Sequence, residues 1–428
     1  MEKFFQLKAH NTNVKTEIMA GITTFMTMAY ILAVNPGILS AAGMPAGGVF
    51  TATALASLIA TLVMALIANL PIALAPGMGL NAFFAFAVVL GMGYSWQLAL
   101  TAVFVEGIIF ILMSFFNIRE AIVKSIPANI KKAVSVGIGL FIAFIGLQNA
   151  GIVVNNDATL VGLGNVTSGP ALVALIGLVL TGVLLALKVK GALLIGIIGT
   201  TIIGIPFGVT SIPQGWSPLK APDAPLLFAF EFDKMFTLDF LVVLFTFLFV
   251  DIFDTIGTLV GVTTQAGLIN KDGSIPRAKQ ALLADAIGTV AGAALGTSTV
   301  TSYIESASGV AEGGRTGLTA LTTAALFGVA LFFSPVFLLV PGAATAPALI
   351  LVGLFMLSPV KDIDLSDYTE SIPAFITMIF MPLTYSIAEG LVFGILAYIF
   401  LKAISGKIKD VTLVTWVVGF FFVLKHLI

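Results

Sequence analysis

The sequence predicts an all-α polytopic membrane protein with about fourteen spans in two halves of seven. Of its 428 residues, 59% are hydrophobic and only 10% are charged, and the mean hydropathy is +1.11. No Asp, Glu, Lys, Arg or His occurs between Ile18 and Val105, which is enough chain for three or four spans of roughly 20 residues. Similar apolar runs recur along the rest of the chain. A chain of this composition cannot cover itself with charge in water, so we expect it in lipid.

The first half contains seven apolar runs bounded by Gly, Pro or charged residues. The candidate spans are 17–38, 47–70, 71–90, 96–117, 127–150, 170–188 and 190–208. A polar, proline-containing stretch follows, with Pro213, Pro218, Pro222 and Pro225.

The second half contains seven further runs and a short final segment. The candidate spans are 237–264, 277–295, 296–310, 316–338, 343–359, 371–386 and 388–405. Residues 411–428 form either a short extra span or, as we favour, an interfacial helix.

Basic residues predict the orientation, because Lys and Arg collect in short cytoplasmic loops. In a fourteen-span chain with a cytoplasmic N-terminus, the basic groups before span one and after spans four, six, eight, ten and fourteen all fall on the inner side. The polar N-terminus lacks the apolar core of a cleaved signal peptide, so span one must direct insertion. The net charge of −1 argues against a nucleic-acid partner, and the absence of Cys excludes disulfides and thiolate metal sites.

Seven is an odd number, so a duplicated half would lie upside down in the membrane. Ala99-Leu100-Thr101 recurs as Ala320-Leu321-Thr322, at an offset of 221 residues. The same offset aligns 75–86 of span three with 296–307 of span ten. Chance matches among Ala, Leu and Gly are common, so the useful result of this alignment is that it pairs spans three and ten.

Spans three and ten are the least helical in composition. Span three contains Pro76, Gly77 and Gly79, and span ten contains a run of Thr, Ser, Val and Tyr, which favours extended backbone. Extended backbone at membrane depth must pair with itself or line a cavity. We therefore expect the two segments to cross as short antiparallel strands at a binding site, where the following helix N-termini suit a polar or anionic ligand. An ordinary Gly-kinked span is the alternative for either segment alone.

Six acids lie inside candidate spans, where a charged side chain costs roughly 2.5 to 3.5 kcal/mol on insertion scales. They are Glu106, Asp251, Asp254, Asp285, Glu305 and Glu389. No Lys or Arg lies at comparable depth in the sequence, so salt bridges cannot explain most of the set. A carboxyl group buried without a cation tends to bind a proton, which suggests coupling to proton movement.

The positions of the acids suggest different roles. Asp251 and Asp254 share one helical face with Thr255, so one is expected to meet a ligand while its neighbour anchors structure. Glu305, beside Ile304 in the extended part of span ten, is the favoured principal ligand. Asp285, among Ala and Gly, is expected to brace two helices.

The remaining acids and the nearby aromatic residues receive weaker assignments. For Glu106 and Glu389 an interhelical hydrogen bond is the favoured interpretation. Phe25, Phe83 and Phe84 could stack on a flat ring, although any one of 35 Phe residues is more often in the core or in contact with lipid.

At this point the sequence resembles the AzgA-like branch of the nucleobase-cation symporter family 2, the purine permeases. The resemblance covers nearly the whole chain. Its most distinctive segments are GITTFMTMAYILAVNP (21–36), APGMGLNAFF (75–84), FVDIFDTIGTL (249–259), STVTSYIESASGVAEGGRTGLTA (298–320) and IPAFITMIFMPLTYSIAEG (372–390).

The resemblance implies two inverted repeats and an elevator-like uptake of purine bases with protons across the cytoplasmic membrane, with no cofactor. It implies a mobile core domain (1–126 and 237–338) and a gate domain (127–208 and 343–428) that forms a homodimer. It also places the base between Asp251 and Glu305, with Asn81 and the backbone of Ala82 and Phe83 assisting. Asp254 and Asp285 match supporting acids.

We expect Thr23 and Phe25 of span one to close the pocket. Related uracil carriers have a His one turn beyond the span-eight acid, where this chain has Thr255, so proton handling is expected to rest on carboxylates.

Other function classes remain as alternatives. A transporter of another planar or anionic solute, such as uracil, xanthine or an inorganic anion, could use the same inverted-repeat fold, but an anion site should carry a buried Arg or Lys. A channel would conduct without saturating. A membrane enzyme is disfavoured, because the chain has no His cluster, Cys or nucleophile motif.

Overall fold

A computed structural model describes residues 2–116, 127–268, 275–413, 415–416, 419–420 and 423. Within this part of the chain, nine helices are long and apolar enough to cross a bilayer, and two shorter apolar helices span Met78–Gly91 and Ala192–Gly204. The protein is therefore a multi-pass membrane protein.

The first half follows the expected order of spans. After α1 (Glu2–Phe5), its elements are α2 (Val14–Met28) and α3 (Ile31–Ala41), α4 (Ala46–Val63) with a π-helical end (Met64–Ala68), β1 (Leu74–Pro76) with α5 (Met78–Ala82) and a π-helix (Phe83–Gly91), α6 (Trp96–Phe116), α8 (Ala128–Asn149), α9 (Gly169–Ala186) and α10 (Ala192–Gly204). A hairpin of β2 (Val153–Asn156) and β3 (Leu160–Leu163), which the sequence did not predict, lies between α8 and α9.

The second half repeats this order. Its elements are α11 (Leu238–Gln265), α12 (Ala278–Leu295), β4 (Val300–Ser302) with α13 (Ser306–Ala311), α14 (Gly317–Ala330) with a 3₁₀ turn (Leu331–Phe333) and α15 (Ser334–Leu338), α16 (Gly342–Met356) with a 3₁₀ turn (Ser358–Asp362), α17 (Tyr368–Leu383), α18 (Ile387–Ile404) and a 3₁₀ turn (Ile408–Asp410). Most of 411–428 lies outside the described residues, so the nature of this segment stays a prediction.

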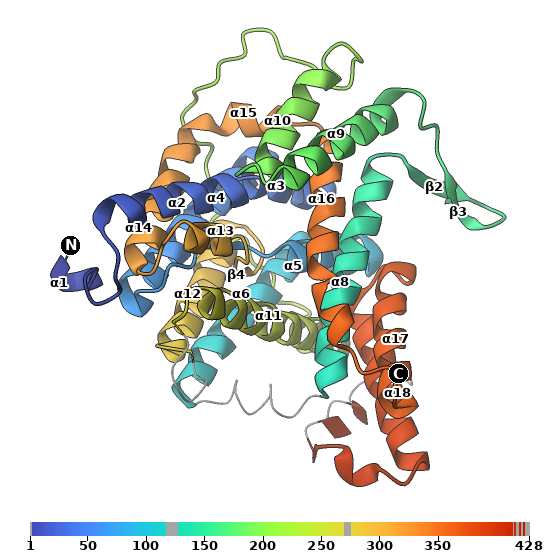
Figure 1. Ribbon diagram of the computed structural model, residues 1–428. Helices are drawn as coiled ribbons and strands as arrows, with labels where there is room; N and C mark the ends of the chain where they lie inside the picture. The colour runs from blue at the N-terminus through green and yellow to red at the C-terminus, as the bar shows by residue number, and fades with distance from the viewer. Residues whose placement is uncertain are drawn as a thin grey trace.

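The helices pack in two groups. Helices α2, α4, α6, α12 and α14 contact one another, together with α3, α11 and α13, whereas α8, α16, α17 and α18 pack together and α9 and α10 join α16. In Figure 1, α8 and α16 run side by side next to the first group, with α17 and α18 beyond them.

Spans three and ten are broken at the centre of the first group, as predicted. Strands β1 and β4 pair antiparallel, with Leu74 opposite Ser302 and Pro76 opposite Val300. The ladder continues at both ends, because Gly77 donates to the Thr299 carbonyl (2.9 Å) and Tyr303 donates to the Ala73 carbonyl (3.0 Å). Two short segments of extended backbone therefore satisfy one another at membrane depth.

The outer edges of both strands are satisfied by threonine hydroxyls from neighbouring helices. The Thr61 hydroxyl of α4 accepts from the Leu74 amide (2.9 Å) and donates to the Leu74 carbonyl (3.0 Å). The Thr289 hydroxyl of α12 does the same for Val300, at 3.3 and 3.1 Å. The two halves thus use the same device, as expected of an inverted repeat.

The offset between the halves is not constant. Helices α6 and α14 begin 221 residues apart, at Trp96 and Gly317, as the sequence comparison indicated. The strands begin 226 residues apart, at Leu74 and Val300, so the expected overlay of 75–86 on 296–307 is displaced by five residues at the strands. The long π-helix after α5 has only the short α13 as its counterpart, which explains the difference.

Segments that the basic residues assign to the same side of the membrane are in contact in the structure. The buried Glu17 carboxylate accepts from the amides of Arg315, Thr316 and Thr319 (2.9, 3.3 and 3.1 Å) at the start of α14. Lys190 pairs with Glu312 at 2.5 Å.

A second set of ion pairs joins the ends of α17 and α18. Lys402, near the end of the span expected at 388–405, lies buried in α18 and pairs with Glu370 at 2.8 Å. Lys407 pairs with Asp367 at 2.7 Å. The segments expected on the inner side around 370 and 407 therefore lie together.

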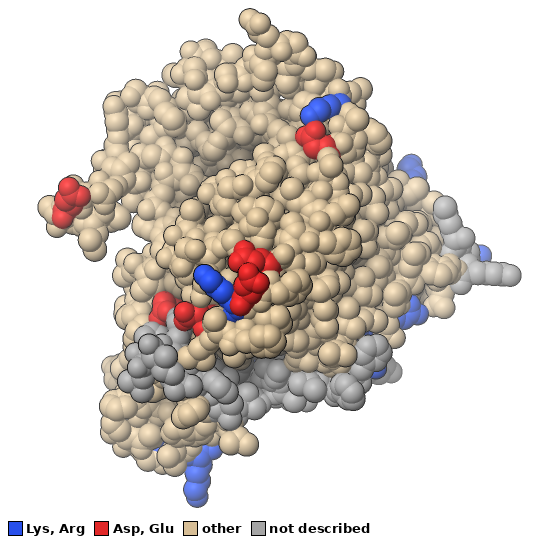
Figure 2. Space-filling view, turned by 180° about the vertical axis from the view of Figure 1, so that it is seen from behind, with Lys and Arg blue, Asp and Glu red and all other residues tan. Residues whose placement is uncertain are grey.

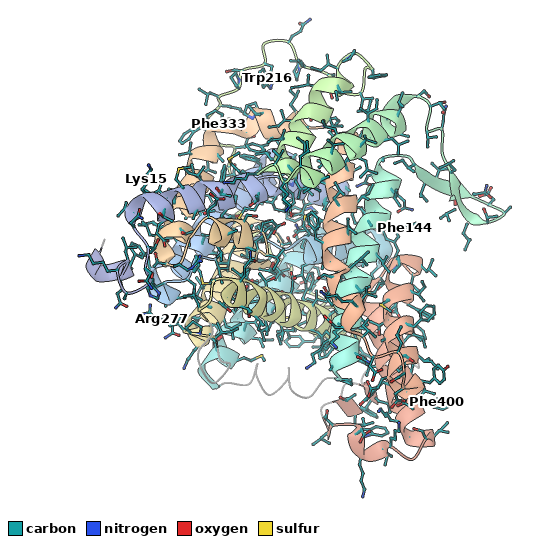
Figure 3. All side chains as sticks on the ribbon, viewed as in Figure 1. Lys15, Phe144, Trp216, Arg277, Phe333 and Phe400 are labelled. Atoms are coloured by element: carbon teal, nitrogen blue, oxygen red, sulfur yellow. The ribbon has the colours of Figure 1, made fainter. Side chains whose placement is uncertain are left out.

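Much of the molecular surface is apolar. Seen from behind, most of the surface carries neither acidic nor basic residues (Figure 2). Figure 3 shows Phe400 of α18 on the outside of the second group, where 63% of this residue is exposed. Val179 of α9 is 68% exposed. Such side chains are suited to contact with lipid.

Candidate binding site

A cavity of about 440 Å³ lies between the two helix groups. The first group contributes Tyr30, Met78, Gly79, Val250, Asp254, Ile256, Gly257, Thr258 and residues 301–305, and the second contributes Lys131, Lys132, Val134, Ser135, Ile138, Val352, Phe355, Met356, Ser358 and Pro359. The crossed strands and α11 thus form one wall, and α8 and α16 form the other, which is mostly apolar but carries Lys131 and Lys132.

Two carboxyl groups face this cavity from different elements. Asp254 lies on α11 and Glu305 follows β4, and the two are close enough to interact electrostatically. The Tyr30 hydroxyl donates to Glu305 Oε1 at 2.7 Å, and the Thr301 side chain lies near enough to the Asp254 carboxyl to interact with it. Each acid thus has a neutral hydroxyl beside it, and its remaining acceptor positions can serve a ligand.

Local breaks in the chain create this geometry. Helix α2 ends at Met28 and α3 begins at Ile31, which leaves Tyr30 at a turn beside span ten. The Thr27 hydroxyl bonds to the carbonyls of Thr23 (3.1 Å) and Thr24 (2.8 Å), and reaches the Glu305 carbonyl at 3.4 Å. The break in span one therefore lies against the break in span ten.

Asp251 does not line the cavity. It is fully buried in α11, where the Thr255 hydroxyl lies 3.1 Å from Asp251 Oδ1 and 2.8 Å from Asp285 Oδ1. The two acids of α11 therefore lie the other way round from the expectation, with Asp254 on the cavity wall and Asp251 in a brace between α11 and α12. One acid of the pair was expected to anchor structure and Asp285 to brace two helices, and in the structure the Thr255 hydroxyl contacts both Asp251 and Asp285.

Asn81 also has a structural position. Its Oδ1 accepts from the Ser298 hydroxyl, and its Nδ2 lies 3.4 Å from the Pro76 carbonyl. The neighbours of Ser298 act similarly, because Thr297 accepts from Asn35 (2.8 Å) and Thr299 donates to Glu106 (2.8 Å). Three successive residues thus anchor the start of β4 to spans one, three and four, which explains Asn81 and confirms the interhelical bond expected of Glu106.

The other expected residues of spans one and three lie behind the cavity wall. Ala82 and Phe83 are buried, and the Phe83 ring packs edge-on against Phe247 at 4.9 Å. Thr23 is buried, and the Phe25 ring packs edge-on against Phe327 at 5.2 Å. Neither aromatic ring is placed to stack on a ligand in this cavity. Ile304, in contrast, lines the cavity as expected and is 47% exposed.

Sequence reasoning missed several cavity residues. Tyr30 lies within a distinctive segment of span one, but only the fold brings it to Glu305. Gly79 allows close packing of α8, because a Cβ there would lie 2.6 Å from Ile138 Cγ2. Phe355 of α16 is the aromatic ring on the apolar wall, and no local signal distinguishes it from the other Phe residues.

Comparison with known proteins identifies the family. Residues 15–393 match the Permease family. The chain is 48% identical over 423 residues to the guanine/hypoxanthine permease PbuG of Bacillus subtilis, covering 96% of each chain. It is 43% identical over 427 residues to the adenine permease AdeP of Escherichia coli, covering 99% of this chain and 95% of that protein.

A solved structure shares the fold. The transmembrane domain of the cyanobacterial bicarbonate transporter BicA superposes with a TM-score of 0.67 at 16% identity, over 89% of this chain and 97% of that one. At this identity the likeness concerns the inverted-repeat fold alone. The sequence relatives and the family match lead to one conclusion: the chain belongs to the permease family known as the nucleobase-cation symporter 2 family, and it is a transporter and not an enzyme.

Proposed function

We propose that this protein carries purine bases, hypoxanthine, guanine or adenine, inward across the cytoplasmic membrane together with protons. The observation that carries the proposal is the pair of carboxyl groups, Asp254 and Glu305, facing one cavity at the crossing of two broken spans. The names of the relatives PbuG and AdeP support the substrate class.

The chemistry of the cavity suits a purine. Carboxylate oxygens accept hydrogen bonds from ring N–H and exocyclic amino groups, and both Glu305 and Asp254 line the cavity. The opposite wall, with Ile138, Val352 and Phe355, is apolar and suits the faces of a flat ring. We therefore propose Glu305 and Asp254 as the ligands of the base, with Asp251, Thr255 and Asp285 supporting them from behind.

Protons enter the proposal through the same carboxyl groups. Two acids that line one partly dry cavity, close enough to interact, repel each other when both are ionised. Protonation of one of them removes a charge that would otherwise oppose movement of the loaded site through the membrane. No cofactor is required for this cycle.

The packing supports an elevator-type movement. In this proposal, the first helix group is the core domain, 1–126 and 237–338, and the second is the gate domain, 127–208 and 343–428. The core carries the acids and slides against the apolar faces of α8 and α16. The gate domain would form the homodimer, with the N-terminus of each chain in the cytoplasm.

The test is purine uptake into proteoliposomes that contain the purified protein. Replacing Glu305→Gln or Asp254→Asn should reduce uptake about 10-fold to 100-fold, because a hydrogen bond to a charged group contributes about 1.5–3 kcal/mol. Glu389→Gln, an acid at the start of α18 that does not line the cavity, is the matched control and should keep the wild-type rate. Wild-type uptake by both cavity variants would refute the assignment.

A binding panel tests the substrate class. Purines, uracil, xanthine and inorganic anions are added separately to the purified protein, and the melting temperature is measured for each. Stabilisation by hypoxanthine, guanine or adenine is expected. The solved structure with a similar fold, BicA, is a bicarbonate transporter. Stabilisation by an inorganic anion and by no purine would therefore overturn the proposal.

A further inference from the structure

We propose that a purine nucleoside 5′-monophosphate binds in the same cavity from the Lys131 and Lys132 end and blocks the transporter. This inference rests on the proposed function, because it takes the base to lie at Asp254 and Glu305. It adds a second ligand class, a phosphorylated purine, and a phosphate subsite at the two lysines.

The length of the cavity is the first observation. Its lining residues on α8 run from Ile138, against Gly79, to Lys131, which is about 10 Å at 1.5 Å per helical residue. On α11 they run from Val250 to Thr258, about 12 Å. The volume of about 440 Å³ falls in the ~300–1,000 Å³ range of pockets that enclose drug-sized ligands, whereas a purine base has only about ten non-hydrogen atoms. A base alone leaves part of this space unfilled.

The distribution of charge is the second observation. The two acids lie on the cavity wall that the crossed strands and α11 form. On the other wall, Lys131 and Lys132 lie in the first turns of α8, across from Ser358 and Pro359, with Ser135 one turn further in. Negative groups on one wall and basic groups on the other match a molecule with amino and N–H donors at one end and a phosphate at the other.

The contacts of Lys132 leave room for this role. Its ammonium donates to the Asp362 carbonyl, and an ammonium has two further N–H donors. The Asp364 carboxyl is near enough to interact with Lys132 and would compete with a phosphate, but Asp362 and Asp364 do not line the cavity. A phosphate held inside the cavity would therefore contact the lysines and not these acids.

If this inference holds, uptake of the base is inhibited by the nucleotide that the cell makes from it. A nucleotide formed inside the cell from the imported base would occupy the cavity while it opens toward the lysines. Its phosphate, held outside the membrane centre, would keep the core from moving, because carrying that charge through the bilayer is costly.

The experiment compares four probes on the purified wild-type protein by isothermal titration calorimetry: guanine, guanosine, guanosine 5′-monophosphate and inorganic phosphate. The nucleotide should bind about tenfold tighter than the nucleoside, the gain expected from one charge-assisted contact. The Lys131→Ala/Lys132→Ala variant should lose this tenfold gain and bind guanine as the wild type does. Lys361→Ala, a nearby lysine outside the cavity lining, is the control and should retain the gain.

Three results separate the possible failures. If the wild type binds none of guanine, hypoxanthine and adenine, the proposed function fails. If it binds guanine but prefers guanosine to the nucleotide, or if the double variant keeps the preference for the nucleotide, the phosphate subsite is wrong. If the lysine effect is seen only in phosphatidylglycerol bilayers and not in phosphatidylcholine, the lysines bind lipid headgroups and the inference is overturned. Nucleotide enclosed in proteoliposomes should also slow guanine uptake by the wild type, but not by the double variant.

Discussion

The threonines that satisfy the edges of the crossed strands provide the sharpest test of the fold. Thr289→Val replaces the hydroxyl with a methyl group of similar size and removes both hydrogen bonds to Val300. The Val300 amide and carbonyl are then buried without these partners, since Val300 and Thr289 are both fully buried. A buried polar group left unsatisfied costs about 1–3 kcal/mol, so the loss should be about 2–6 kcal/mol for the two groups of Val300. Thr61→Val should cost a similar amount at Leu74.

The assay is the unfolding free energy of purified protein in mild detergent, measured by titration with a denaturant. Thr289→Ser keeps the hydroxyl and should retain most of the stability. Thr246→Val is the matched control, because the Thr246 hydroxyl is buried but bonds only to Val242 of its own helix, whose carbonyl can keep its place in the helix. If Thr289→Val costs no more than Thr246→Val, the hydroxyls are not needed to support the strands and our reasoning is wrong.

Two further predictions concern the loops that the basic residues assign to one side of the membrane. Glu17→Ala should lower the free energy of unfolding by about 2–4 kcal/mol, because it removes the acceptor for three backbone amides at the start of α14. Denaturant titration measures this loss, and a loss below about 0.5 kcal/mol would contradict the prediction. Hydrogen bonds from Lys407 and then from Thr369 hold the pKa of Asp367 well below its ordinary value, so the contribution of the Lys407–Asp367 contact to stability is present above about pH 4 and is lost as the pH falls through the lowered pKa. The stability difference between wild type and Lys407→Ala should therefore shrink in acid, and a difference that grows in acid would refute this assignment.

The order and number of spans could be predicted from the sequence. A charge-free stretch and a series of apolar runs require a helix at each crossing, because only helices and closed barrels satisfy their backbone in lipid. The breaks in spans three and ten were also predictable, since Pro76 and the Thr-rich run at 297–301 disfavour helix over just those residues. These properties are local, so they can be found without knowing the fold.

Which polar residues face the cavity and which make structural hydrogen bonds could not be predicted in this way. Asp251 and Asp254 are three residues apart on one helix, and which of them faces a cavity depends on where α12 and the second helix group pack around α11. The side-chain amide of Asn81 could bind a ligand equally well. Its oxygen, however, accepts a hydrogen bond from Ser298, which lies 217 residues away in the chain.

By itself, the sequence determined that this chain lies in a membrane, where its spans run and which segments break, because hydropathy and backbone propensity are properties of neighbouring residues. Only the tertiary structure decided that Asp254, Glu305 and Tyr30 meet at one cavity while Asp251 and Asn81 hold the scaffold. The physical reason is that a buried polar group must find a hydrogen-bond partner, and the partners here come from spans that are distant in the chain.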